Sequence, residues 1–147
     1  MIMPKPTVKY EVVVGVPDDT EYPIFCPGPE FSVITGTMMK CQLDEMRSAW
    51  KKYAKEFYEA NDIYVSAIAI PGRALYHEDW GCPENGERVL SFHCTANPEF
   101  IKDLHMYEEG IQYIAKKLKK EFKQHTITIT RLYADIVYLT DDNNEEE

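Results

Sequence analysis

The sequence lacks the short motifs that mark common enzyme classes. Its seven glycines form no G-x-G-x-x-G or G-K-[ST] phosphate loop. It has no G-x-S-x-G nucleophile elbow and no H-E-x-x-H helix. No two of its four cysteines have the C-x-x-C spacing of structural zinc sites and thioredoxin-like redox pairs. Because these motifs are missing, the sequence gives no reason to expect a bound cofactor or metal.

Long apolar runs are also missing. The longest uncharged apolar stretch, residues 63–71, contains Ser66 and is too short to cross a bilayer. Residues 1–10 have no apolar core of the kind that a signal peptide needs. We therefore expect a cytoplasmic protein with free thiols and no membrane partner.

The charge of the chain is strongly acidic. It carries 25 acidic and 16 basic side chains, for a net charge of −9, and five of the acidic residues fall within residues 140–147. Direct binding to nucleic acid needs clustered lysine and arginine, so this composition argues against it. The same charge could steer the chain to a basic site on a partner protein, although solubility explains it more simply.

Hydrophobic periodicity predicts six main elements. Alternating or continuous apolar patterns indicate strands, and apolar residues at helical spacing indicate helices. The expected strands are residues 7–16, 63–70, 88–95 and 126–139, with a bulge near Arg131 and a weak extra strand at 31–37. The first expected helix spans residues 42–60, and the second begins at Pro98 after an Asn97 cap.

This order predicts an α+β fold of the ferredoxin-like βαββαβ type. Its antiparallel sheet would carry both helices on one face, with a proline-rich insertion at residues 17–37 between the first strand and the first helix. We expect one domain over residues 1–139 and a disordered acidic tail over residues 140–147. The other sheet face would be covered by a second copy, giving a homodimer, or by the insertion.

The predicted hairpin between the second and third strands gathers the most reactive side chains. Tyr76, His77, Glu78, Asp79 and Trp80 are consecutive, and an Asn85-Gly86 turn signal follows them. His77 and Cys82 could reach His93 and Cys94 across the hairpin to hold a metal. Adjacent residues of a strand point to opposite faces, however, so we predict no metal site there.

Two arginines and a His-x-Thr sequence complete the candidates. Arg73 and Arg88 flank the hairpin, where they could bind an anionic ligand or pair with neighbouring carboxylates. His93 and Thr95 have the His-x-Thr form that two-histidine phosphoesterases use twice, but the chain has no second copy. The candidate ligand-binding residues are therefore Arg73, Tyr76, His77, Glu78, Asp79, Trp80, Arg88, His93 and Thr95.

Three functional hypotheses follow. The leading one is a small, acidic, non-enzymatic binding or inhibitor protein that acts through a protein partner, because no acid, base and nucleophile set is assembled. An inhibitor encoded by a phage or a mobile element would fit this profile. The second is a protein that binds or sequesters a small anionic ligand or nucleotide. The third is a small enzyme that uses the region of His77 and His93.

Overall fold

The computed structural model of the 147-residue chain describes residues 2–17 and 42–141. Four strands and two main helices follow one another in the βαββαβ order that the sequence predicts. The elements are β1 (Lys5–Gly15), α2 (Gln42–Asn61), β2 (Ile68–Ala74), the short helix η1 (Glu78–Trp80), β3 (Glu87–Thr95), α3 (Leu104–Glu121) and β4 (Thr128–Ile136).

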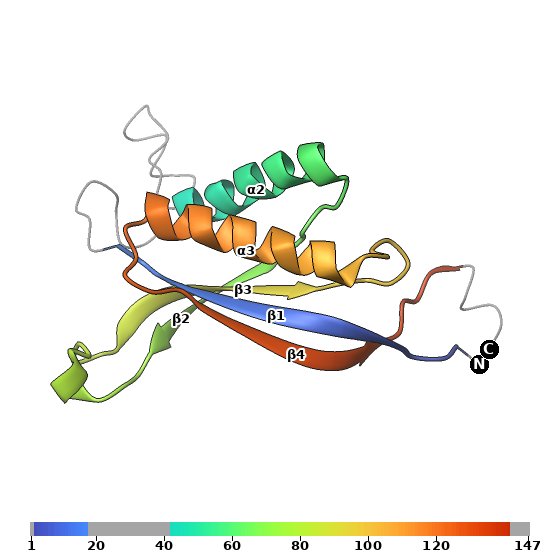
Figure 1. Ribbon diagram of the computed structural model, residues 1–147. Helices are drawn as coiled ribbons and strands as arrows, with labels where there is room; N and C mark the ends of the chain where they lie inside the picture. The colour runs from blue at the N-terminus through green and yellow to red at the C-terminus, as the bar shows by residue number, and fades with distance from the viewer. Residues whose placement is uncertain (1, 18–41, 142–147) are drawn as a thin grey trace, which may run out of the picture.

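The four strands form one antiparallel sheet in the order β2-β3-β1-β4, with α2 and α3 packed side by side over one face (Figure 1). The two central strands are therefore the first and the third in the chain, as in the ferredoxin-like arrangement. This confirms the predicted fold class. The insertion at 17–37 and the tail at 140–147 lie almost entirely outside the described residues, as does the weak extra strand at 31–37.

The core lies between the sheet and the helices. Successive strand side chains alternate between the two faces, so every second residue of β1 and β3 points toward the helices. Trp50 of α2 stacks on Phe92 of β3 at 4.5 Å between ring centroids, and its Nε1 donates to the Val65 carbonyl. The buried hydrophobic residues of the strands are Val8, Tyr10, Val12, Val14, Leu90, Phe92 and Cys94.

The two helices approach closely at Gly110. A Cβ atom at this position would lie 2.8 Å from the Phe57 ring and 2.9 Å from the Val65 side chain. Real Cβ atoms do not come this close to their neighbours, so glycine is what lets α3 lie against α2 and the segment before β2.

The strand predicted at residues 63–70 has the wrong bounds, and its apolar pattern had suggested a central position in the sheet. The strand is β2, Ile68–Ala74, and it lies at the edge of the sheet. The apolar run is continuous because its first half, with the buried Val65, packs beneath α2 rather than pairing in the sheet. Pro71, just beyond the predicted strand, lies inside β2, where an edge position tolerates the missing N–H.

The predicted start of the second helix is also wrong. Asn97 caps only an isolated turn, because Glu99 N donates to its side chain and Ile101 N to its carbonyl. The helix begins at Leu104 after a second cap, in which Asp103 accepts a hydrogen bond from Met106 N at 3.0 Å. The bulge expected near Arg131 is absent, since the β1–β4 register runs unbroken from Lys5↔Ile136 to Val13↔Thr128.

The described residues leave the second sheet face without a covering layer. Ile68 and Ile70 of β2 and Leu132 of β4 are exposed there. Dimerisation through this face stays a prediction. Within residues 2–17 and 42–141, neither helix has the length and hydrophobicity that crossing a bilayer requires.

Candidate functional site

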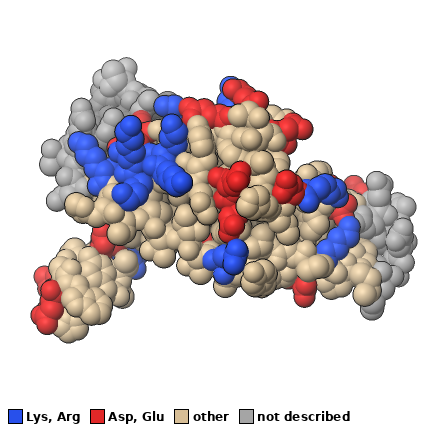
Figure 2. Space-filling model, viewed as in Figure 1, with Lys and Arg blue, Asp and Glu red and all other residues tan. Residues whose placement is uncertain are grey.

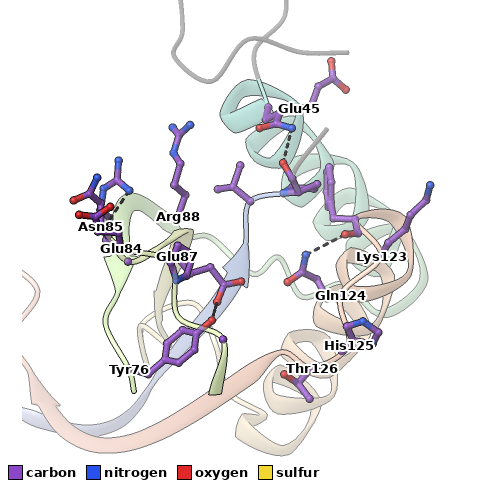
Figure 3. A pocket seen from close by; sticks show the side chains of 18 of the residues that line it. Glu45, Tyr76, Glu84, Asn85, Glu87, Arg88, Lys123, Gln124, His125 and Thr126 are labelled. Atoms are coloured by element: carbon purple, nitrogen blue, oxygen red, sulfur yellow. Dashed lines mark hydrogen bonds between the residues drawn. The ribbon is translucent and has the colours of Figure 1, made fainter. Parts of the chain in front are cut away.

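A cavity of about 1550 Å³ opens where β1 ends, and we call it the hairpin cavity (Figure 3). Its walls come from four segments that are far apart in the sequence. They are the end of β1 (Val16 and Pro17), the first turn of α2 (Gln42 and Glu45), the β2–β3 hairpin (Arg73, Tyr76, Gly81 and residues 83–88) and the connection from α3 to β4 (residues 121–126).

Gln124 ties the α3–β4 connection to the end of β1. Its Oε1 accepts from Gly15 N at 2.9 Å, and its Nε2 donates to Gly15 O at 2.9 Å and to Phe122 O at 3.0 Å. The pairing of β1 with β4 ends at Val13↔Thr128, so Gly15 lies beyond the reach of β4. The Gln124 carboxamide therefore satisfies backbone groups that a neighbouring strand would otherwise pair.

Gly15 brings Glu87 close to Gln124. A Cβ atom at Gly15 would lie 2.8 Å from Gln124 Oε1 and 3.0 Å from Glu87 Oε1, so both side chains occupy the space that a larger residue would fill. The other carboxylate oxygen of Glu87 accepts a hydrogen bond from the Tyr76 hydroxyl at 3.2 Å (Figure 3). Partial desolvation and this hydrogen bond both raise the pKa of Tyr76.

The hairpin cavity presents charges of both signs. Its carboxylates belong to Glu45, Glu84, Glu87 and Glu121, and its cationic side chains to Arg73, Arg88 and Lys123. Arg73 donates to the Asn85 carbonyl across the hairpin at 3.2 Å. Such a lining suits a ligand that itself carries both charges, because guanidinium groups bind carboxylates and carboxylates bind cations.

The tip of the hairpin projects away from the helices and the rest of the sheet (Figure 1). His77 caps η1 by accepting from Asp79 N at 3.0 Å, and its ring lies 5.9 Å from that of Trp80. The side chains of Glu78 and Asp79 are exposed, and Figure 2 shows acidic groups at the end of this projection. The tip thus offers an aromatic surface beside two carboxylates.

The structure divides the nine predicted residues among three places. Arg73, Tyr76 and Arg88 line the hairpin cavity. The four residues His77, Glu78, Asp79 and Trp80 form the exposed tip. His93 and Thr95 lie further along β3 on the uncovered sheet face, where His93 contacts the Ser91 hydroxyl at 3.0 Å and Glu11 at 3.9 Å.

The four side chains considered for a metal do not converge. Cys94 is buried on the helix side of the sheet, whereas His93 lies on the opposite face. Burial raises the pKa of the Cys94 thiol to about 12. Cys82 and Cys94 are free thiols, and the described residues contain no group of three or more histidine, cysteine or acidic side chains that could hold a metal ion.

Sequence reasoning missed Gly15, Glu87 as a site residue, and Gln124. These three meet from segments up to 109 positions apart, and none belongs to a motif. The one available signal was Gly15 itself, a residue without a side chain that directly follows three valines at the end of the strand. Such a glycine often marks a place where other groups approach closely.

Comparison with known proteins gives a family match and a match to a solved structure. A family model described as SAM lyase matches residues 6–140. A solved structure described as a phage SAM lyase in complex with S-methyl-5′-thioadenosine is 12% identical to the chain, with a TM-score of 0.45, and the match covers 90% of each chain. No curated protein matches. At 12% identity, we transfer no residue of that structure to this chain.

Proposed function

Because the chain belongs to the SAM lyase family, we propose that it cleaves S-adenosylmethionine and that the hairpin cavity binds this substrate. A lyase family is a family of enzymes. The prediction of a non-enzymatic inhibitor that acts through a protein partner is therefore wrong. The family match agrees better with the two alternatives drawn from the sequence, a protein that binds a small charged molecule and a small enzyme.

The error came from equating catalysis with an assembled acid, base and nucleophile. S-Adenosylmethionine contains a sulfonium, which leaves as a neutral thioether without being protonated. A protein that cleaves such a molecule needs mainly to bind it and to orient its reacting atoms. Sequence motifs for acid–base or nucleophilic chemistry are not required for that task.

The proposed reaction needs no water. A carboxylate oxygen of the methionine moiety attacks the γ-carbon of the same chain, which is bonded to the sulfonium. A C–O bond forms while the bond between this carbon and sulfur breaks. The electron pair of that bond stays on sulfur, and the products are S-methyl-5′-thioadenosine and homoserine lactone. Substrate and products carry the same net charge, so no proton is gained or lost. The protein contributes by holding the methionine chain in the folded conformation that closes the ring.

The lining of the hairpin cavity is complementary to this substrate. Arg73 and Arg88 suit the substrate carboxylate, and the cavity carboxylates suit its ammonium and sulfonium groups. Tyr76 adds an aromatic ring to the lining of the cavity. The volume of about 1550 Å³ exceeds what a ligand of this size occupies, and typical small-molecule sites span roughly 300–1,000 Å³.

The hairpin tip extends the proposed site. His77 and Trp80 form an aromatic pair that an adenine ring could stack on, and Glu78 and Asp79 lie beside it. His93 and Thr95 are outside this region, because they lie on the uncovered sheet face. We therefore propose that the substrate binds at the hairpin and does not contact His93 or Thr95.

Mass spectrometry of the reaction tests this proposal. We expect the purified full-length protein to convert S-adenosylmethionine into equal amounts of S-methyl-5′-thioadenosine and homoserine lactone. In oxygen-18 water, the label should enter only the carboxyl group of homoserine formed by later lactone opening. Label in the homoserine hydroxyl would indicate hydrolysis instead, and an unchanged substrate would refute the proposal.

A pair of charge variants locates the site. Arg73→Gln removes a cation that lines the cavity, whereas Lys55→Gln removes an exposed cation on α2 away from it. We expect kcat/KM to fall at least about ten-fold in the first variant, the size of losing one charged contact, and to stay unchanged in the second. Equal activity of both variants would place the substrate elsewhere.

A further inference from the structure

The four carboxylates of the hairpin cavity are not equivalent. Glu121, at the end of α3, accepts a hydrogen bond from the Tyr53 hydroxyl in the helix layer. Glu84 lies in the exposed hairpin turn, and Glu45 lies in the first turn of α2, where it favours the helix dipole. Glu87 alone of the four lies on a strand, as the first residue of β3, paired with Ala74.

The Glu87 carboxylate accepts one hydrogen bond and occupies the space that Gly15 leaves open. The Tyr76 hydroxyl donates to its Oε2 at 3.2 Å, while its Oε1 lies against the Cα of Gly15, where a Cβ would come within 3.0 Å. Gly15 is fixed in turn by its two hydrogen bonds to Gln124. Strand pairing therefore positions the backbone of Glu87, and the Tyr76 hydroxyl orients its carboxylate.

We infer that Glu87 faces the sulfonium of S-adenosylmethionine and lets the site distinguish the cationic substrate from the neutral thioether product, an inference that rests on the proposed function. A carboxylate attracts a sulfonium but gains nothing from a thioether of the same shape. The site therefore holds the substrate more strongly than the product, and product release becomes easier once the C–S bond has broken.

This role has a kinetic signature. The positive charge on sulfur diminishes as the C–S bond breaks, so Glu87 attracts the substrate more strongly than the transition state. Replacing it by glutamine should raise KM while leaving kcat unchanged or slightly higher. A group that stabilises the transition state, or a residue needed only for folding, would lower kcat instead.

A binding experiment tests the inference without turnover. Sinefungin carries an ammonium in place of the sulfonium, and S-adenosylhomocysteine carries a neutral thioether with the same adenosine and amino acid groups. By titration calorimetry, we expect the native protein to bind sinefungin about ten-fold more tightly, the size expected of one carboxylate near a cation at a partly exposed site. Glu87→Gln should remove this preference, and Glu59→Gln, the same change at an exposed position of α2 away from the hairpin cavity, should retain it.

A glycine pair tests how Glu87 is positioned. Gly15→Ala places a methyl group against Glu87 and Gln124, whereas Gly72→Ala on β2 meets only Val89 at an ordinary 3.8 Å. We expect Gly15→Ala to reduce the preference for sinefungin and Gly72→Ala to keep it. Both positions have backbone angles that alanine adopts, and thermal unfolding of each variant verifies that it is folded.

The outcomes separate the two proposals. If the protein neither cleaves S-adenosylmethionine nor binds either analogue, the proposed function fails. If the native protein cleaves the substrate but Glu87→Gln keeps the preference for sinefungin, or lowers kcat at unchanged KM, the assignment of Glu87 alone is wrong. A preference lost equally in Glu59→Gln would show a general effect of negative charge and would also overturn it.

Discussion

The two tryptophans of the chain occupy opposite environments. Trp50 lies between the helices and the sheet, 4% exposed, stacked on Phe92 and hydrogen-bonded to the Val65 carbonyl. Trp80 lies at the hairpin tip and is 78% exposed. Nothing in the packing of the core requires a large aromatic residue at the tip, whereas the core depends on Trp50.

This difference separates stability from function within one small fold. The helix-covered side of the sheet holds the buried residues, and the β2–β3 hairpin holds aromatic and acidic side chains that remain in contact with water. Residues whose exposure brings no folding benefit are candidates for binding. Substitutions on the two sides should therefore affect different measurements.

The largest effect should come from Trp50→Ala. Truncating a buried tryptophan costs about 3–5 kcal/mol, because the lost contacts leave a cavity that the surroundings only partly fill. We expect a loss of this size in the free energy of unfolding, measured by urea denaturation with far-ultraviolet circular dichroism. A loss below about 1 kcal/mol would mean that the core repacks freely at this position.

Gly110→Ala should have the next largest effect. Alanine gains about 1 kcal/mol over glycine in a helix, but the added methyl group would overlap Phe57 and Val65, and overpacking costs about 1–3 kcal/mol. We expect a net loss of stability of about 1 kcal/mol, again by urea denaturation. A more stable variant would show that α3 can move away from α2 without cost.

Tyr10→Phe should have an effect of similar size, and this effect depends on pH. Burial and a hydrogen bond to Glu108 raise the pKa of Tyr10 to about 12, above its ordinary value of 10.0. The folded state therefore binds this proton more tightly, a contribution that is full below pH 10 and is lost as the pH rises through 12. We expect a loss of about 1 kcal/mol at neutral pH and a shallower decline in alkaline unfolding curves.

The smallest effect on stability should come from Trp80→Ala. An exposed side chain away from the core changes stability by about 0.5 kcal/mol or less. The same variant should bind S-adenosylhomocysteine more weakly if the tip stacks on adenine, measured by titration calorimetry with Lys55→Gln as the control. Unchanged affinity would restrict the proposed site to the cavity.

The sequence predicts the order of elements and the fold class because alternation and helical spacing are local signals. The predicted bounds of β2 are wrong because a continuous apolar segment has the same sequence pattern in both of two environments. It can pair in a sheet, or it can pack beneath a helix as Val65 does. Arg73 and Tyr76 are found because they flank a recognisable turn. Glu87, Gly15 and Gln124 become neighbours only through the tertiary fold, so no local pattern reveals them.

Pro71 in the edge strand limits how readily copies of this protein aggregate through their sheets. An exposed strand edge carrying isoleucines, such as Ile68 and Ile70 of β2, is a template on which further chains can pair and aggregate. A proline has no N–H to offer an incoming strand, so pairing along β2 is interrupted at its middle. The projecting hairpin can therefore keep its reactive side chains open to small molecules while resisting the growth of intermolecular sheets.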